Sequence, residues 1–193
     1  MNRIGIVCDC HNTLINSNDA WIKAFSDFAG AEHAEEIALY LYGKMKRRDL
    51  AQKYNIDFSV VEERADKYEK KNSQLISALT IMKEIGIPLV AVSNAPAIRV
   101  LKDMEITGIR NLFLEVYTGD DGGKRNKEIF DKILQKYNLN YIIFLGNEEF
   151  DDHIEHDRVI SFALTSFLRE RFAIVKGYPF DAYGIITQEV SMQ

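Results

Sequence analysis

One local pattern limits the fold of this chain more than any other feature. Short runs of apolar residues alternate with longer stretches of helical periodicity. The apolar runs lie at residues 4–8, 87–92, 112–117, 141–145 and 159–164. Runs of this length are typical of strands buried on both faces of a parallel sheet. Strands that alternate with helices favour right-handed crossovers and helices on both faces. We therefore predict an α/β, Rossmann-like three-layer core with a mostly parallel sheet.

The segment between the first two apolar runs has a different pattern. Nothing from residue 16 to residue 72 alternates like a strand, and apolar residues such as Trp21, Phe25 and Phe28 recur at helical spacing. This indicates three or four short helices joined near Gly30, Gly43 and residues 55–57. A helix with Leu75, Leu79, Met82 and Ile85 on one face follows. The core then comprises residues 1–15 and 73–193, with a separate helical segment at 16–72. Residues 183–186 are a further candidate strand.

Composition excludes several classes of protein. The charges sum to 24 − 29 = −5, so the chain lacks the basic footprint of a nucleic-acid-binding protein. Its two cysteines, Cys8 and Cys10, make no disulfide framework. No apolar stretch approaches the ~20 residues that a membrane span needs, and the N-terminal run is too short for a signal peptide. We therefore expect a cytoplasmic protein that binds neither nucleic acid nor a membrane.

Polar residues follow the predicted strands at their carboxyl ends, where open parallel sheets bind ligands. Asp9 follows the first strand, Ser93 and Asn94 follow the second, and the third leads into a loop with Lys124. After the fourth strand come Gly146, Asn147, Glu148, Glu149, Asp151 and Asp152. A carboxylate can attack phosphorus as a nucleophile, and a hydroxyl and an ammonium group can stabilise the phosphoryl oxygens. The acidic cluster could hold Mg²⁺.

In their order along the chain, these motifs resemble those of the haloacid dehalogenase-like hydrolases. Residues 9–14 (DCHNTL) are similar to the first family motif, Asp-x-Asp-Gly-Thr-Leu. Ser93-Asn94 resembles the second, Lys124 before Glu128-Ile129-Phe130 the third, and Gly146-Asn147 with the later acids the fourth. Each motif alone is weak, but the ordered set of four is specific. The resemblance covers nearly the whole core, and it implies that the helical segment is a small cap that chooses the substrate.

The resemblance also implies roles for individual residues. Asp9 would be the nucleophile that forms an aspartyl phosphate from a small phosphorylated metabolite, and His11 the general acid and base. Thr13 would support the first motif and, with Ser93, Asn94 and Lys124, would bind the phosphate. The implied Mg²⁺ ligands are Asp9, the backbone carbonyl of His11, Asn147, Asp151 and Asp152, and Asp152 fits the later acid best by spacing.

Two positions depart from the family pattern. His11 stands where the family has a second aspartate, although imidazole, with an unperturbed pKa of about 6.5, can act as both acid and base. Asn147 stands where the family has a metal-binding aspartate, so we expect weaker Mg²⁺ affinity. The departures leave two alternatives open: a catalytically silent binding protein, or a dehalogenase or phosphonatase of the same family.

The residues also have plainer interpretations. Asp9 could be a turn residue, Ser93 a helix cap, and Lys124 a solvated loop charge. A zinc site built from Cys8, Cys10, His11, His153 and His156 is disfavoured, because the two cysteines lie on the strand face opposite Asp9 and no second cysteine pair exists. The sequence indicates neither the substrate's identity nor the oligomeric state.

Overall fold

The computed structural model describes residues 3–43, 45–147, 153–164, 174–175 and 178–179. The chain divides into two compact units. One comprises Met1–Leu14 and Lys71–Gln193, and the other comprises Ile15–Lys70. Each unit has its own elements and its own apolar core.

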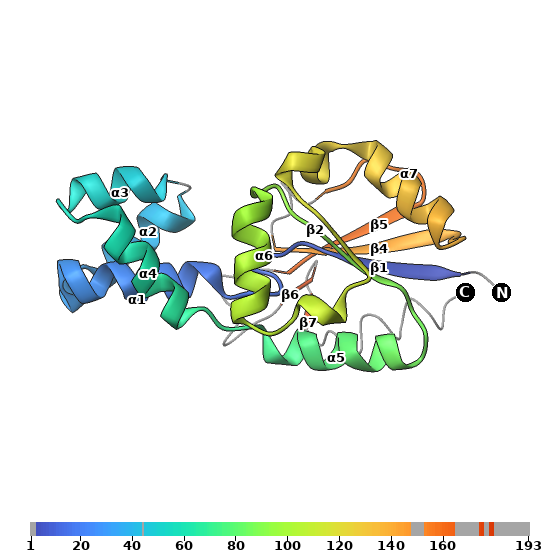
Figure 1. The fold of residues 1–193 in the computed structure, drawn as a ribbon, viewed down its shortest axis with the longest axis horizontal. Coiled ribbons are helices and arrows are strands. Elements are labelled where there is room, and N and C mark those ends of the chain that lie inside the picture. Colours follow the sequence, from blue (N-terminus) through green and yellow to red (C-terminus); the bar gives the residue numbers. More distant parts are fainter. Residues whose placement is uncertain (1–2, 44, 148–152, 165–173, 176–177, 180–193) are drawn as a thin grey trace. The chain divides into compact units, whose positions relative to one another are not determined.

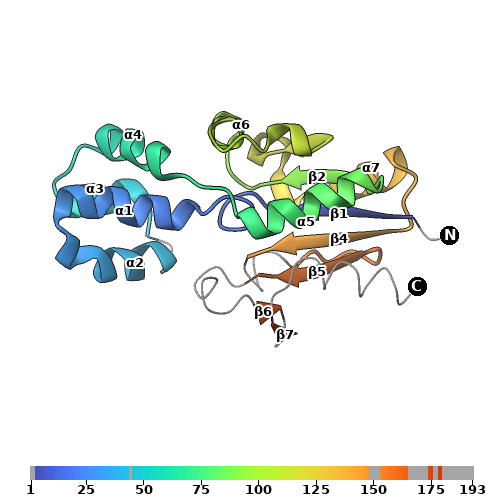
Figure 2. The ribbon, with the colours of Figure 1, turned by 90° about the horizontal axis from the view of Figure 1, so that it is seen from below.

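The larger unit contains a five-stranded sheet in the order β3-β2-β1-β4-β5, and every neighbouring pair is parallel. Its strands are β1 (Ile4–Cys8), β2 (Leu89–Val92), β3 (Glu115–Tyr117), β4 (Tyr141–Gly146) and β5 (Val159–Ala163). Figure 2 shows β2, β1, β4 and β5 side by side in this order. The predicted α/β architecture with a parallel sheet is confirmed. Because β1 is the central strand, residues just beyond its carboxyl end have neighbours on both sides.

Helices cover both faces of this sheet. α5 (Ser73–Glu84) lies on one face and α7 (Lys127–Lys136) on the other, while α6 (Ala97–Ile106) follows β2 (Figure 1). The face under α7 packs through buried side chains of the helix and of three strands: Ile129, Phe130, Ile133, Leu134, Val7, Val90, Val92, Ile142 and Phe144. Side chains alternate along a strand, so Ile6 and Cys8, the neighbours of Val7 in β1, face α5. The double-sided burial explains why the strands have continuous apolar sequences.

The smaller unit is helical. Its elements are α1 (Ser17–Ala29), a 3₁₀ turn (Ala31–His33), α2 (Ala34–Tyr42), α3 (Arg47–Lys53) and α4 (Phe58–Tyr68). Their apolar faces meet in one cluster around Trp21, Phe25, Ile37, Leu50 and Val61. The Trp21 ring stacks on Phe58 with 5.6 Å between ring centroids. The cluster gives this unit a core of its own.

The structure differs from the sequence expectations in several details. β3 begins at Glu115, because Arg110–Leu112 forms a 3₁₀ turn where we expected strand. Phe28 and Ile85 are 39% and 68% exposed, so neither belongs to the apolar face predicted for its helix. A short antiparallel pair, β6 (Ile174–Val175) and β7 (Tyr178–Pro179), was not predicted. The candidate strand at 183–186 lies outside the described residues.

No helix in the described part of the chain has the length and apolar character needed to cross a membrane.

Candidate active site

Asp9 lies directly beyond β1, in the middle of the sheet. Its backbone N–H donates to the carbonyl oxygen of Leu145 on β4 at 2.8 Å, so the strand pairing extends through this residue. The residue is only 4% exposed. A carboxylate this buried is costly unless it is paired and hydrogen-bonded.

Both carboxylate oxygens of Asp9 have a partner. The Lys124 ammonium lies 3.2 Å from Oδ1, and the Thr13 hydroxyl donates to Oδ2 at 3.5 Å. Thr13 and Lys124 are themselves buried. The ammonium supplies the opposite charge that a buried carboxylate needs, and it also reduces the repulsion that an approaching anion would meet.

A tight turn carries the chain from Asp9 to Thr13. Asn12 adopts a left-handed backbone conformation with φ 61°, and the Leu14 N–H donates to the Cys10 carbonyl at 2.9 Å. Asparagine is among the few residues other than glycine that take this conformation at little cost. The turn brings the Thr13 side chain back to Asp9, four residues earlier in the chain.

Ser93 and Asn94 lie at the end of the neighbouring strand β2. Ser93 is 2% exposed, and its hydroxyl accepts a hydrogen bond from the Ala95 N–H at 3.3 Å. The Asn94 side-chain oxygen accepts from the backbone N–H of Lys124 at 2.9 Å. Asn94 therefore ties the β2 turn to the loop that supplies the Lys124 ammonium.

The loop before Lys124 is held by its own hydrogen bonds. The Asp121 carboxylate accepts from the Thr118 N–H at 2.8 Å, and the Gly123 N–H donates to the Thr118 carbonyl at 2.9 Å. Gly123 has φ 58°, and a Cβ atom built on it would lie 2.5 Å from the Asn94 side-chain oxygen. Glycine is therefore required here both by the backbone and by the close approach.

His11 is held by an acid that the sequence did not single out. Its Nε2 lies 2.8 Å from Oδ2 of Asp103 on α6, and the Arg99 Nε lies 2.7 Å from the same oxygen. The Asp103 side chain is completely buried. The available signal was an acid within an apolar stripe, since Asp103 shares the buried face of α6 with Val100 and Met104.

Asn147 follows β4, the strand that pairs with β1, and it is 9% exposed. It is therefore at the same sheet edge as Asp9. The other proposed metal ligands, Asp151 and Asp152, lie outside the described residues. Within the described part of the chain, no three His, Cys, Asp or Glu side chains form a group that could hold a metal ion.

Cys8 and Cys10 flank Asp9 and are fully buried. Burial, and secondarily the negative charge of Asp9, raise the pKa of the Cys8 thiol well above its ordinary value. A thiol with a raised pKa stays protonated at neutral pH and is a poor nucleophile. Asp9, in contrast to Cys8, has a positively charged partner, Lys124, for its ionised form. Asp9 is therefore the better candidate for the nucleophile.

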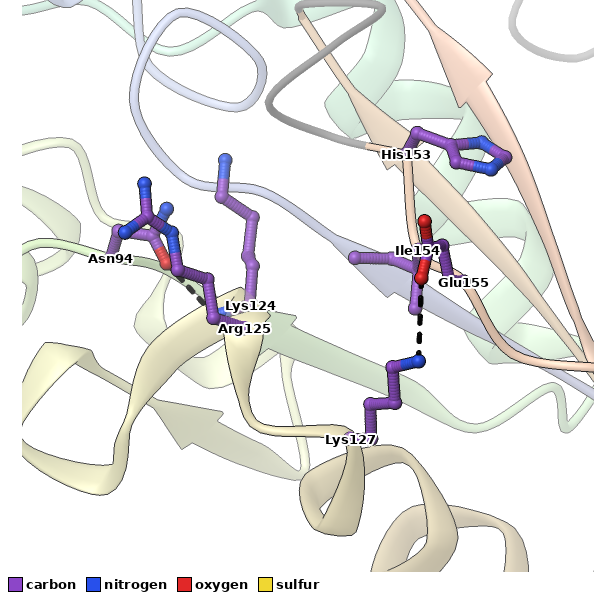
Figure 3. A pocket seen from close by; sticks show the side chains of 7 residues that line it. All are labelled: Asn94, Lys124, Arg125, Lys127, His153, Ile154 and Glu155. Carbon is purple, nitrogen blue, oxygen red and sulfur yellow. Dashed lines mark hydrogen bonds and ion pairs between the residues drawn. The ribbon is translucent and has the colours of Figure 1, made fainter.

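A pocket of about 360 Å³ adjoins Lys124, and Figure 3 shows the side chains around it. Its lining consists of Asn94, Lys124, Arg125, Lys127, His153, Ile154 and Glu155. Lys127 is paired with Glu155 at 3.5 Å. With three basic side chains and one acidic side chain, the lining has an excess of positive charge, which favours an anion.

The structure thus connects several of the predicted site residues. Thr13 and Lys124 each contact the Asp9 carboxylate, and the Asn94 side chain is hydrogen-bonded to the backbone of Lys124. Ser93 and Asn147 lie at the ends of the two strands that flank β1. The His11 ring is bonded to Asp103.

Comparison with known proteins gives a family and a fold. A family model described as haloacid dehalogenase-like hydrolase matches residues 6–156. This range includes every described residue of the candidate site. No curated protein matches the chain.

Several solved structures are similar over most of the chain. A defluorinating L-2-haloacid dehalogenase is 13% identical with a TM-score of 0.69, covering 97% of this chain and 94% of that one. A predicted phosphoglycolate phosphatase from Haemophilus somnus 129pt is 18% identical with a TM-score of 0.59, covering 96% and 97%. A hydrolase of the same family from Deinococcus radiodurans R1, with bound phosphate and sodium, is 18% identical with a TM-score of 0.59, covering 75% and 72%. At these identities the likeness establishes the fold.

Proposed function

This chain belongs to the haloacid dehalogenase-like hydrolases, and from that premise we propose that it is a phosphatase with Asp9 as its nucleophile. The observation that carries the proposal is the pairing of a buried carboxylate with a buried ammonium, Asp9 with Lys124 at 3.2 Å. The substrate is a small phosphorylated metabolite. The phosphate bound in one structural relative of the same family is consistent with this chemistry.

The reaction has two steps. In the first, an oxygen of the Asp9 carboxylate attacks phosphorus, a new oxygen–phosphorus bond forms, and the bond from phosphorus to the ester oxygen breaks. The ester oxygen leaves with the electron pair and receives a proton from the His11 imidazolium. In the second step, water attacks the phosphorus of the aspartyl phosphate, the imidazole takes a proton from that water, and the Asp9 carboxylate departs.

Other residues of the site stabilise charge and hold the substrate. The Lys124 ammonium lies where it can offset both the carboxylate and the phosphoryl oxygens. The hydroxyls of Thr13 and Ser93 are hydrogen-bond donors at the same edge of the sheet. We assign phosphate binding to Ser93 and Lys124, and support of the nucleophile to Thr13. Asn94 contributes by holding the Lys124 loop.

The donor atoms at this edge of the sheet fit Mg²⁺, which prefers oxygen and keeps several water ligands. Asp9 would supply a carboxylate oxygen, His11 its backbone carbonyl and Asn147 its amide oxygen. Asp151 and Asp152 remain proposed ligands outside the described residues. When bound, Mg²⁺ would neutralise charge on the phosphoryl oxygens.

The basic pocket beside Lys124 supports an anionic substrate. Arg125 and Lys127 add positive charge within the 360 Å³ pocket that Lys124 and Asn94 also line. The small helical unit at Ile15–Lys70 matches the expected cap in its composition of helices. We propose that it selects the substrate.

A panel of phosphate esters assayed with Mg²⁺ and with EDTA tests the proposal. Wild-type protein should hydrolyse at least one ester only when Mg²⁺ is present, and Asp9→Asn should abolish that turnover. Asp157→Asn, which changes an exposed aspartate in the same way, should keep full activity. Equal hydrolysis by Asp9→Asn and wild type would exclude Asp9 as the nucleophile.

The same panel separates two further candidates. The structural similarity to an L-2-haloacid dehalogenase, together with the departures at His11 and Asn147, favours a halide-releasing enzyme as the second candidate. Release of halide from a 2-haloacid in EDTA, without phosphatase activity, would establish it. Absence of both activities would favour a catalytically silent binding protein.

A further inference from the structure

We propose that Asp103 is a positioning residue. It holds the His11 imidazole through Nε2 and leaves Nδ1 as the ring nitrogen that transfers protons next to Asp9. The inference rests on the proposed phosphatase function and adds a residue from α6 to it. Neither Asp103 nor its neighbour Arg99 belongs to any of the four motifs.

The contacts are short and buried. Oδ2 of Asp103 lies 2.8 Å from His11 Nε2 and 2.7 Å from Arg99 Nε. The Asp103 side chain is 0% exposed, the His11 side chain 16% and the Arg99 side chain 14%. A hydrogen bond from the imidazole and an ion pair with the guanidinium therefore converge on one oxygen of a carboxylate that has no contact with solvent.

This acid is not explained by the stability of α6. Its neighbours on the buried face, Val100 and Met104, are apolar. Replacing a buried ion pair by apolar side chains of similar volume is often neutral or stabilising. An acid at this position therefore points to a requirement of the site, and the group that it reaches there is the imidazole of His11.

The hydrogen bond selects the tautomer of the ring. An ionised carboxylate only accepts hydrogen bonds, so the nitrogen that faces it must carry the hydrogen. In the neutral ring, Nε2 of His11 is then the donor and Nδ1 has the free lone pair. Arg99 places a permanent positive charge beside the same carboxylate, with its Nε 2.7 Å from Oδ2.

The atom left for chemistry is also the one with the right reach. Nδ1 is bonded to Cγ, as are the carboxylate oxygens of an aspartate. Nδ1 of His11 is therefore as many bonds from the backbone as the oxygens of the aspartate that the family pattern has at this position. The more distant Nε2 reaches Asp103. One ring can thus be anchored at α6 and act beside Asp9.

The proton balance of the two steps follows. The imidazolium has hydrogens on both nitrogens, and it gives the Nδ1 proton to the leaving ester oxygen as the oxygen–phosphorus bond breaks. The neutral ring keeps its Nε2 hydrogen on Asp103. Nδ1 then accepts the proton from the water that attacks the aspartyl phosphate, which restores the imidazolium.

The test compares an alkyl phosphate, whose leaving group needs a proton, with an aryl phosphate, whose leaving group does not. The kcat/KM value reports the first irreversible step, which here is the attack of Asp9. Asp103→Asn should lower kcat/KM by about 100-fold for the alkyl ester and change it little for the aryl ester. Glu105→Gln makes the same change at an exposed position of α6 and should alter neither value.

A double substitution separates positioning from a general effect on the fold. If Asp103 acts through the imidazole, Asp103→Asn should have no further effect on the alkyl-to-aryl ratio in a His11→Ala background. The proposal would be overturned if Asp103→Asn lowered kcat/KM equally for the alkyl and the aryl ester. It would also be overturned if Asp103→Asn lowered the alkyl-to-aryl ratio as much in the His11→Ala background as in the wild-type background.

A measurement on the unaltered protein covers the case in which Asp103→Asn does not fold. Nitrogen-15 NMR of the His11 ring, at a pH where the ring is neutral, should show the hydrogen on Nε2. Hydrogen on Nδ1 would overturn the proposal. Wild-type protein that turns over no ester would instead overturn the proposed function, while the NMR experiment would still give the tautomer.

Discussion

At the scale of single residues, the site depends on how one carboxylate is kept ionised away from water. Asp9 is nearly inaccessible to solvent, and the Lys124 ammonium and the Thr13 hydroxyl contact its two carboxylate oxygens. Removing one partner of a buried ion pair leaves the other charge uncompensated. The same pair therefore affects both the stability of the fold and the reactivity of the nucleophile.

Lys124→Met tests this dual role. The substitution keeps much of the side-chain volume but removes the positive charge beside Asp9. We expect kcat/KM for a phosphate ester to fall about 100- to 1,000-fold, and the free energy of unfolding to fall by on the order of 3 kcal/mol. Steady-state kinetics and denaturant unfolding measure the two effects.

Lys132→Met is the matched control, because Lys132 is an exposed lysine on α7. It should change neither the kinetics nor the stability appreciably. A Lys124→Met protein with wild-type kinetics would contradict the role given to the ammonium.

Asn147→Asp restores the negative charge that the family pattern has after β4. Mg²⁺ sites gain affinity with the charge of their ligands, so we expect the Mg²⁺ concentration for half-maximal activity to fall about tenfold. Titration of activity with Mg²⁺ measures it. Saturation of the wild-type protein at low micromolar Mg²⁺ would show that Asn147 does not weaken the site.

At the scale of elements, the loops that follow neighbouring strands are held together by side-chain hydrogen bonds and by the close approach of one backbone to the other. Asn94 at the end of β2 accepts a hydrogen bond from Lys124, and Gly123 leaves no room for a Cβ atom beside that amide. The position of the ammonium therefore depends on a glycine that makes no chemical contribution of its own.

Gly123→Ala should displace Asn94 and, with it, Lys124. Gly108→Ala is a suitable control, since Gly108 has a similar φ of 68° but nothing within 4 Å of the added Cβ atom. Both substitutions should cost about 1–2 kcal/mol of stability for the left-handed backbone. Only Gly123→Ala should cost more and also lower kcat/KM. Equal effects of the two substitutions on stability and activity would refute this explanation.

In the helical unit, Glu36 of α2 is bound by the hydroxyls of Tyr40 and Tyr54, each at 2.9 Å. These hydrogen bonds lower the pKa of Glu36 from 4.5 to about 2. A lowered pKa means that this carboxylate contributes to stability above pH 4.5 and that the contribution is lost as the pH falls toward 2.

Carbon-13 NMR of the Glu36 carboxyl group should follow this titration. Tyr54→Phe removes one hydroxyl and should raise the pKa toward 4.5. Tyr68→Phe removes a hydroxyl that donates to Asp27 instead, so it should leave the Glu36 titration unchanged. A Glu36 pKa that does not respond to Tyr54→Phe would show that the hydrogen bond is absent in solution.

The sequence predicted the elements best where the residues are buried on two sides. The strands β1, β2 and β4 were recognisable because their apolar runs are continuous. β3 is an edge strand, and its start was misplaced because Leu112 is apolar but belongs to a 3₁₀ turn. Ile85 was misassigned because it caps the end of α5, beyond the buried face. Local hydrophobicity does not distinguish these cases.

At the scale of the whole molecule, charge is distributed unevenly. The chain has a net charge of −5, yet the pocket beside Lys124 is lined with three basic side chains. The basic side chains therefore attract an anionic ligand to this pocket, although the net negative charge of the chain repels it. Added salt should weaken substrate binding only modestly, because local contacts inside a pocket are screened less than the long-range field.

The sequence predicted those site residues that belong to the ordered motifs and missed those that do not. Asp9 and Thr13 follow β1 and Lys124 lies in the loop after β3, so they were predicted together as residues at strand ends, and in the structure Thr13 and Lys124 both contact Asp9. Asp103 was missed because its partner, His11, is 92 residues away along the chain. Contacts of this kind depend on how a helix packs, and a linear motif does not contain that information.

The central claim is that Asp9 becomes covalently phosphorylated during turnover. The most direct measurement is peptide mass spectrometry of protein quenched with acid while it hydrolyses a phosphate ester in the presence of Mg²⁺. We predict one phosphoryl group on the peptide that contains Asp9, and none in Asp9→Asn. Steady turnover of the ester without a phosphoryl group on that peptide would contradict the account.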